Sequence, residues 1–275
     1  PFPVKILTVK EPRNSELLGL LQSEGFDAEL IFGIDARESG REYLEARADL
    51  DFLDGIREGL SDGELACAIG HKTIYRRILD QGLEMALVLE DDALPVAPLN
   101  ELCKEIQNLR LDEPSIFWLG GISGPRLTLP SKHPLSGNQV RRFLTPPRAT
   151  VGYLINRSAC EVLDSTSRVV GRADWPITAY LVDFYSVSPA PVEMSDEESL
   201  IEIGRGERRF QSSIPDSFPE AIHSLKRVFD ELRPKRLSLV RGLLGTWIST
   251  MTRYFFPKFI DSLFLIIIKL SANRK

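Results

Sequence analysis

The stretch ALVLEDDALPV, residues 86–96, places three consecutive carboxylates directly after an apolar run. A short, uninterrupted apolar run is typical of a strand that is buried on both faces, as in a parallel sheet. In open α/β sheets, ligands bind outside the carboxyl ends of the strands. The position of Glu90, Asp91 and Asp92 therefore predicts that they border a ligand site.

The three acids also indicate what such a site would hold. In an extended backbone, Glu90 and Asp92 point to one side and Asp91 to the other. Carboxylates that converge repel one another unless a cation joins them, and Mg²⁺ or Mn²⁺ takes oxygen ligands from carboxylates and substrate phosphates. The cluster favours a divalent-metal site for a phosphorylated substrate. The alternative is a solvated acidic turn, since runs of charge are usually solvated.

The residues around this strand alternate between strand and helix patterns. Residues 4–9 and 28–35 predict buried strands, and apolar spacing predicts a helix over 14–26 between them. A helix over 61–82 begins at a capping box formed by Ser61 and Glu64. Further segments are a helix at 99–110, a strand at 115–121, a Pro-, Gly- and Ser-rich mobile loop with a short hairpin at about 122–148, and a strand running into a helix at 150–163. This order predicts an α/β fold with a mostly parallel central sheet.

The charge of the 275-residue chain is distributed unevenly. The net charge is −5, but residues 226–275 contain eleven basic and three acidic residues, a net +8, which leaves −13 on residues 1–225. We therefore expect a domain over 1–225 followed by a separate basic tail. The acidic balance of the chain as a whole argues against a nucleic-acid partner.

Within the tail, residues 236–270 are apolar, basic and aromatic. Pro257, Lys258 and Asp261 interrupt the apolar run, so it does not predict a membrane-spanning helix. Amphipathic helices bound to an anionic membrane surface fit better, and a helix packed on the domain or on a dimer partner is the alternative.

The cysteines indicate the compartment. Cys67, Cys103 and Cys160 are far apart and form neither a disulfide framework nor a CxxC pair, so we expect free, buried thiols. The sequence does not open with a signal-peptide pattern. Together with the basic tail, these features predict a cytoplasmic protein at the inner face of the cell membrane.

The segment GELACAIGHKTIYRRILDQGLEMALVLEDDALP, residues 63–95, resembles glycosyltransferase family 25, the lipooligosaccharide-type galactosyl- and glucosyltransferases. That family has a G-E-x-x-C-x-x-S-H helix followed by a strand ending in E-D-D. Gly63, Glu64, Cys67 and His71 match the helix motif, and Gly70 stands where the family often has Ser.

Other segments resemble the family in the same order, over about residues 4–201. They place Arg13 after the first strand and Asp35 after the second, with Ala36 where the family has Gly. Thr150 and Tyr153 fall in a G-T-x-x-Y stretch in which Ala149 replaces Gly, and Asp174 falls in a P-x-D segment. The resemblance implies a GT-A-type, Rossmann-like domain that uses a nucleotide-sugar donor.

The resemblance also implies roles for individual residues. The acidic run would be the counterpart of the family's metal motif, with Asp92 directly and Glu90 through water holding Mn²⁺ or Mg²⁺. The expected donor-binding residues are Arg13, Asp35, His71 and Asp91. Family members of this kind invert the anomeric centre, which requires a base on the acceptor hydroxyl. Asp174 is the first candidate for this base, and it lies beside Trp175, whose ring could face a sugar. The alternative is that Asp174 caps the start of a helix. Asp183 and Glu193 are weaker candidates for the base.

The function implied is the metal-dependent, inverting transfer of a hexose from a UDP-sugar to a lipid-linked lipopolysaccharide or lipooligosaccharide acceptor. Galactose is the favoured sugar and glucose the next. Two alternatives stay open. A nucleotidyltransferase would use a Gly-rich phosphate loop near the first strand, and TVKEPRNSE, residues 8–16, lacks those glycines. A non-catalytic nucleotide-binding protein at the membrane surface would keep the fold without turnover.

Overall fold

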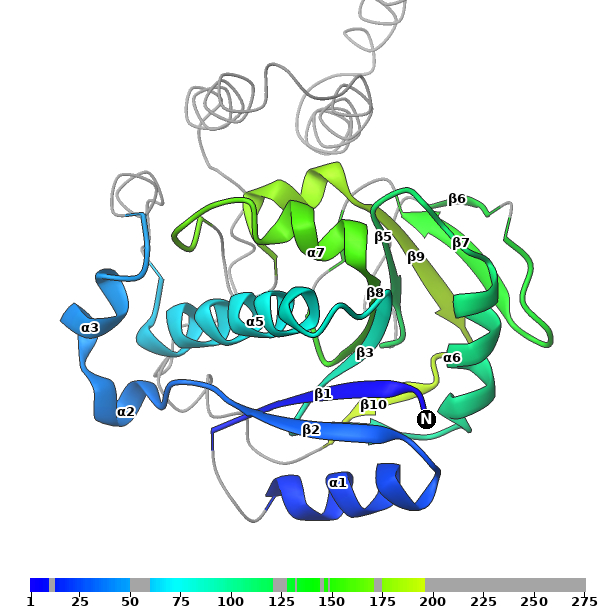
Figure 1. Cartoon of the computed structure of the whole chain (residues 1–275), viewed down its shortest axis with the longest axis horizontal. Helices are drawn as coiled ribbons and strands as arrows, with labels where there is room; N and C mark the ends of the chain where they lie inside the picture. Colours follow the sequence, from blue (N-terminus) through cyan, green and yellow to red (C-terminus); the bar gives the residue numbers. More distant parts are fainter. Residues whose placement is uncertain are drawn as a thin grey trace, which may run out of the picture.

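The computed structural model describes residues 1–9, 13–49, 60–120, 128–131, 133–143, 146–147, 149–170 and 175–195. The described part centres on one eight-stranded sheet, in the order β2-β1-β3-β8-β5-β9-β7-β6 (Figure 1). The strands are β1 (Pro3–Thr8), β2 (Asp27–Phe32), β3 (Met85–Glu90), β5 (Ser115–Trp118), β6 (Thr128–Pro130), β7 (Gln139–Phe143), β8 (Gly152–Asn156) and β9 (Asp183–Ser188).

The sheet is mixed but largely parallel. Strand β1 pairs in parallel with both β2 and β3, and β5 pairs in parallel with β9. Strand β8 runs antiparallel between β3 and β5, and β7 runs antiparallel to β9 and β6. The expected α/β class and parallel character are confirmed, whereas the two reversed strands were not foreseen.

The apolar run over residues 86–89 belongs to β3, an interior strand of this sheet. Leu87 and Leu89 pack into the hydrophobic core on one face, and Ala86 and Val88 pack into the core on the other. Because successive side chains of a strand point to opposite faces, a strand buried on both faces needs an apolar residue at every position.

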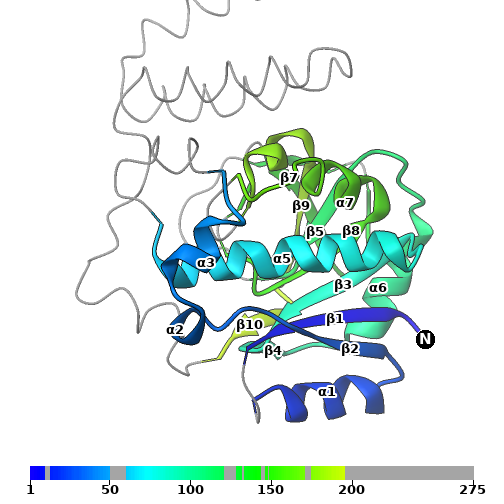
Figure 2. The same ribbon diagram turned by 60° about the vertical axis from the view of Figure 1, so that its left-hand side comes forward.

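Helices cover both faces of the sheet (Figures 1 and 2). On one face lie α1 (Arg13–Ser23) and α6 (Leu99–Asn108), whose buried leucines share a core with β1 and β3. On the other lie α5 (Asp62–Asp80), α7 (Arg157–Leu163) and the 3-10 helix η1 (Ile177–Leu181). The capping box predicted at the start of α5 is present in full.

Several short elements complete the fold. The helices α2 (Ala36–Ser39) and α3 (Arg41–Glu45) and the two-stranded pairing of β4 (Ala93–Pro95) with β10 (Val192–Met194) were not expected from the pattern. The short hairpin expected in the long loop is formed by β6 and β7, and it extends the central sheet.

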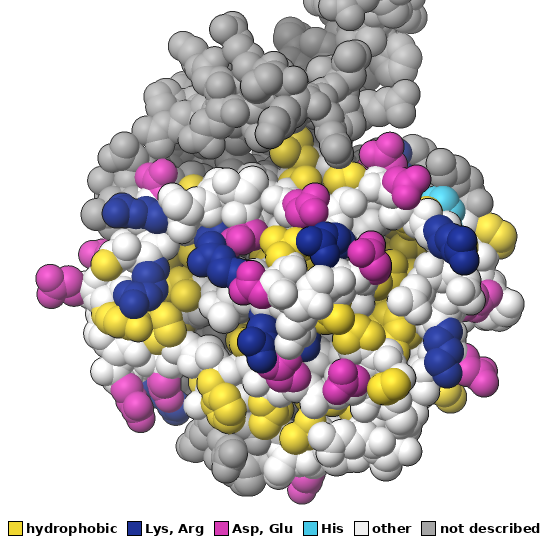
Figure 3. Space-filling model, in the orientation of Figure 1, with side chains coloured by type: hydrophobic (Ala, Val, Ile, Leu, Met, Phe, Trp, Pro, Cys, Tyr) yellow, Lys and Arg dark blue, Asp and Glu magenta, His cyan; other side chains and the backbone are white. Residues whose placement is uncertain are grey.

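The tail predicted to contact a membrane, residues 226–275, lies outside the described residues. In the part of the chain that the structure does describe, no helix combines the length and apolar character that a membrane span requires. On the face shown in Figure 3, acidic and basic side chains of the described residues are interspersed.

Candidate active site

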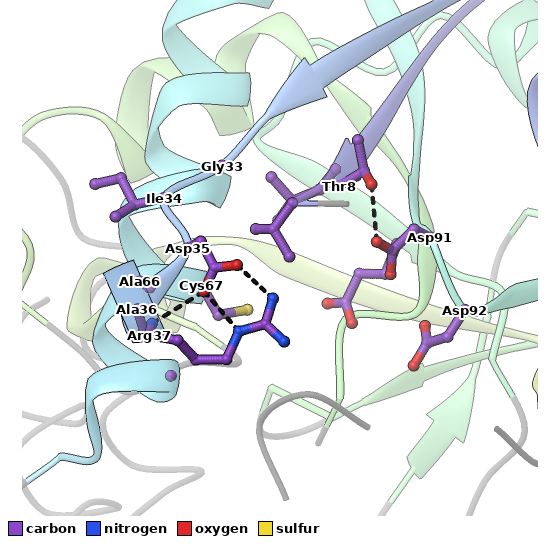
Figure 4. Close-up of a pocket in the computed structure, with 14 residues that line it drawn as sticks. Thr8, Gly33, Ile34, Asp35, Ala36, Arg37, Ala66, Cys67, Asp91 and Asp92 are labelled. Atoms are coloured by element: carbon purple, nitrogen blue, oxygen red, sulfur yellow. Dashed lines mark hydrogen bonds and ion pairs between the residues drawn. The ribbon is translucent and has the colours of Figure 1, made fainter. Parts of the chain in front are cut away.

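A cleft opens at the carboxyl ends of β1, β2 and β3, where the sequence places the acidic run. Its walls come from Thr8 at the end of β1, from Asp35 and Arg37 after β2, from Cys67 on α5 and from the residues that end β3 (Figure 4). Because the three strands are parallel, their ends meet at one edge of the sheet, and the helix α5 closes the cleft from one face.

Glu90 points from this edge toward α5. It continues the side of β3 that carries Ala86 and Val88, so its carboxylate enters the layer beneath the helix. There, Glu90 Oε1 lies 3.0 Å from Nε2 of His71 and accepts a hydrogen bond from the Thr150 hydroxyl. On the other side of the imidazole, His71 Nδ1 lies 2.9 Å from the Tyr153 hydroxyl.

This arrangement keeps Glu90 charged. Burial acts to raise the pKa of its carboxyl group, but the hydrogen bond from His71, the attraction of the imidazole and the hydrogen bond from Thr150 outweigh it. The pKa of Glu90 therefore lies below its ordinary value. A carboxylate held in this state can accept hydrogen bonds or ligate a cation, and it is a poor proton donor.

Asp91 and Asp92 face the cleft differently. Asp91 Oδ2 accepts a hydrogen bond from the Thr8 hydroxyl at 2.8 Å, and Figure 4 shows its side chain turned toward β1. Asp92 follows in the turn, also in the wall of the cleft, and its backbone carbonyl accepts a hydrogen bond from Ser195 N at 2.8 Å. The acidic run therefore directs its side chains into different surroundings.

Asp35 and Arg37 form the facing wall of the cleft. Asp35 caps α2 by accepting a hydrogen bond from Arg37 N at 2.9 Å, and it also accepts one from Arg37 Nε at 2.8 Å. The Arg37 side chain keeps about half of its surface exposed. This wall therefore presents both a carboxylate and a cation to any molecule in the cleft.

The structure places the remaining candidates elsewhere or leaves them outside its described part. Arg13 is the first residue of α1, and its side chain is not among the described ones; Asp174 lies outside the described residues. The ring of Trp175 is buried against Tyr153 and Phe184, so the expectation that it faces a sugar is wrong.

The two weaker candidates for the base also have defined places. Asp183 begins β9 at the opposite edge of the sheet, where it pairs with Arg142, so it cannot serve this cleft. Glu193 lies on β10, paired in register with Leu94.

Sequence reasoning missed three contributors to the site. Thr8 could have been found by the pattern that identified Glu90, Asp91 and Asp92, because it too is a polar residue at the end of a buried strand. Arg37 follows Asp35 by two residues, a spacing that suits a capping pair. Thr150 was part of the family stretch, but its hydrogen bond to Glu90 depends on the reversed direction of β8, which no local pattern shows.

Comparison with known proteins bears on this geometry. The family model described as glycosyltransferase family 25 (LPS biosynthesis protein) matches residues 7–175, from the end of β1 to just before η1. Procollagen galactosyltransferase 1 of Danio rerio is 24% identical over 207 residues, covering 70% of this chain and 32% of that protein. Procollagen galactosyltransferase 2 of Homo sapiens is 25% identical over 88 residues, which cover 30% of this chain and 14% of the human protein. The chain thus spans about a third of the length of the zebrafish relative.

Proposed function

Because the chain belongs to glycosyltransferase family 25, we propose that it transfers a hexose from a UDP-sugar to a saccharide acceptor. Galactose is the favoured sugar, because the relatives carry the name galactosyltransferase, and glucose is the next candidate. A lipopolysaccharide or lipooligosaccharide acceptor is supported by the description of the family.

The observation that carries this proposal is the composition of the cleft wall. A nucleotide sugar brings a diphosphate, which needs positive charge, and ribose hydroxyls, which need hydrogen-bond acceptors. The cleft offers Asp91 and Asp92 on one wall and the Asp35–Arg37 pair on the other. Acidic residues after such strands commonly bind ribose, so we assign Asp35 to the nucleoside and Arg37 to the phosphates.

The donor set fits a divalent cation on the side of the acidic run. Carboxylate oxygens are hard ligands, which suit Mn²⁺ or Mg²⁺. We place the cation on Asp92, with Glu90 contributing through water because its Oε1 is held by His71 and Thr150. When bound, such an ion neutralises the charge that develops on a departing diphosphate.

The other residues of the proposal act on the substrates. Asp91 contributes to donor binding from its position beside Thr8, and His71 acts through Glu90, because both of its ring nitrogens contact protein groups. Arg13 is assigned to the diphosphate, and Asp174 to removal of the acceptor proton in an inverting transfer. Support for both comes from their places in the family motifs.

We also propose that the protein works in the cytoplasm, at the inner face of the cell membrane. The basic, aromatic segment 236–270 supports binding to anionic lipid. A lipid-linked acceptor would then be presented to the cleft at the membrane surface.

Calorimetric titration of UDP-galactose and UDP-glucose, with and without Mn²⁺, tests the donor and the metal together. We expect Mn²⁺-dependent binding to the wild type, at least tenfold weaker binding to Asp92→Asn, and tighter binding of the sugar that is the donor. Asp80→Asn is the matched control, because Asp80 is an exposed carboxylate at the far end of α5. If a folded wild-type protein binds neither nucleotide sugar, the proposal is wrong.

A further inference from the structure

Three side chains of different chemistry meet where α5 passes over the end of β3. The Cys67 thiol, the His71 imidazole and the Glu90 carboxylate each offer one ligand atom, and these atoms all lie within 4.8 Å of one another. Cys67 and His71 are four residues apart on α5 and so share one face of the helix. In the part of the chain that the structure describes, this is the one group of three such ligands, and Asp91 and Asp92 are not members of it.

The spacing of the nitrogen and oxygen ligand atoms is close to that around a tetrahedral metal ion, and the Cys67 sulfur lies within 4.8 Å of both. His71 Nε2 and Glu90 Oε1 are 3.0 Å apart, whereas nitrogen and oxygen ligands at bond lengths of about 2.0–2.1 Å around tetrahedral zinc lie about 3.3 Å apart. A shift of a few tenths of an ångström would open the pair. The burial of His71 restricts larger movements of its ring.

His71 and Glu90 each have a hydrogen-bond partner of the kind that orients the ligands in known metal sites. Metal-binding histidines almost always form a hydrogen bond through the other ring nitrogen, and ligating carboxylates are themselves hydrogen-bonded. Here His71 Nδ1 lies 2.9 Å from the Tyr153 hydroxyl, and Thr150 donates a hydrogen bond to Glu90. Both ligands are therefore held in place from behind.

We propose that Cys67, His71 and Glu90 bind a Zn²⁺-class ion whose fourth coordination position opens into the cleft. Sulfur and nitrogen ligands select such ions over Mg²⁺ and Mn²⁺, so this site differs in chemistry from the all-oxygen site at Asp92, with which it shares Glu90. Binding replaces the direct His71–Glu90 hydrogen bond with two metal–ligand bonds and moves the imidazole proton from Nε2 to Nδ1, which then donates it to the Tyr153 hydroxyl. The thiol proton of Cys67 is released to solvent. Cys67 and Glu90 both line the cleft, which gives the ion and its fourth ligand access. The inference does not depend on the proposed transferase activity.

Cys67 is also the thiol best placed to become a ligand. The chain has three cysteines, and Cys103 and Cys160 are fully buried, as expected. Burial raises the pKa of Cys103 to about 12 and the pKa of Cys160 further still. Cys67 is partly exposed, so the expectation of a buried thiol is wrong at this position. A metal–thiolate signal from this protein would therefore come from Cys67.

Titration of the reduced, chelator-treated, untagged full chain with Co²⁺ tests the site, because thiolate-bound Co²⁺ has a charge-transfer absorption band in the near ultraviolet. We expect this band in the wild type and its displacement by Zn²⁺. Cys67→Ser should remove the band and weaken Co²⁺ binding at least tenfold. Tyr153→Phe should weaken binding about tenfold, the effect typical of losing an orienting partner.

Control variants separate this site from its neighbours. Cys103→Ala should keep the band, and Asp92→Asn should keep it while losing Mn²⁺-dependent binding of the nucleotide sugar. A test without variants uses an alkylating reagent: bound Zn²⁺ should protect Cys67 from alkylation, which peptide mapping would measure. The proposal is overturned if the folded wild type shows no thiolate band, if the band survives Cys67→Ser, or if Zn²⁺ leaves the alkylation of Cys67 unchanged.

Discussion

The ion-pair cluster around Glu29 allows a quantitative prediction about the frame that carries the cleft. Glu29 on β2 lies opposite Lys5 on β1 and pairs with its ammonium group, which is almost fully buried. It also accepts hydrogen bonds from Arg77 Nε at 2.9 Å and from Gln81 at 3.0 Å. The cluster joins β1, β2 and α5; Thr8 ends β1, Asp35 follows β2, and His71 lies on α5.

The magnitude follows from the pKa of Glu29. Burial acts to raise this pKa, but the hydrogen bonds from Arg77, Lys5 and Gln81 prevail and lower it from an ordinary value of 4.5 to about 2. At 1.36 kcal/mol per unit, the shift corresponds to about 3 kcal/mol of stability at neutral pH, an upper value because the Glu29 side chain is partly exposed. Since the pKa falls on folding, this contribution is complete above pH 4.5 and is lost as the pH falls through about 2.

Glu29→Gln is therefore expected to lower the free energy of unfolding by about 2–3 kcal/mol at pH 7, because it also leaves the buried Lys5 cation without its counter-charge. Urea unfolding followed by circular dichroism measures the change. The difference between variant and wild type should shrink as the pH approaches 2. Glu84→Gln, at an exposed position just before β3, is the control. A loss below about 0.5 kcal/mol at pH 7, the range of ordinary surface substitutions, or a loss that does not change with pH, would refute this reasoning.

Two further predictions concern positions where this sequence departs from the family pattern. Gly70→Ala should destabilise the protein by about 1 kcal/mol, because the added Cβ would lie 2.8 Å from Leu7 Cδ1. The control is Gly19→Ala, in a helix with open space around it, which should instead stabilise the protein by up to about 1 kcal/mol. Equal shifts of the two melting temperatures would contradict the prediction. Ala149→Gly should stabilise by about 0.5–1 kcal/mol, because Ala149 has φ +67° in the left-handed region that favours glycine; a lower melting temperature in calorimetry would contradict it.

The sequence predicted most of what depends on local pattern. The run 86–89 was interpreted correctly as a strand buried on both faces, and Ser61 with Glu64 located the start of α5. The acids after β3 were correctly expected at the edge of the sheet where a cleft opens. These predictions rest on periodicity and on capping chemistry, both of which are written into neighbouring residues.

What the sequence did not predict depends on how distant elements pack. Nothing local shows that β8 runs in reverse, and so nothing local brings Thr150 to Glu90. The partners of His71 come from β3 and β8, which are 19 and 82 residues away along the chain. Trp175 was misread because an aromatic residue beside a candidate base has the same sequence signal whether it faces a sugar or the core.

The reversed strand β8 has a consequence for how the chain tolerates insertions. Because β8 runs against β3, the start of β8 lies beside the end of β3, where Thr150 contacts Glu90, while Asn156 at the far end of β8 lies beside the start of β3. Extra residues at Gly82, at the other edge of the sheet, would add only the modest entropy of a longer loop. Extra residues just before Thr150 would displace the hydroxyl that holds Glu90. Domain fusions and loop grafts are therefore best made at the edge where β3 begins.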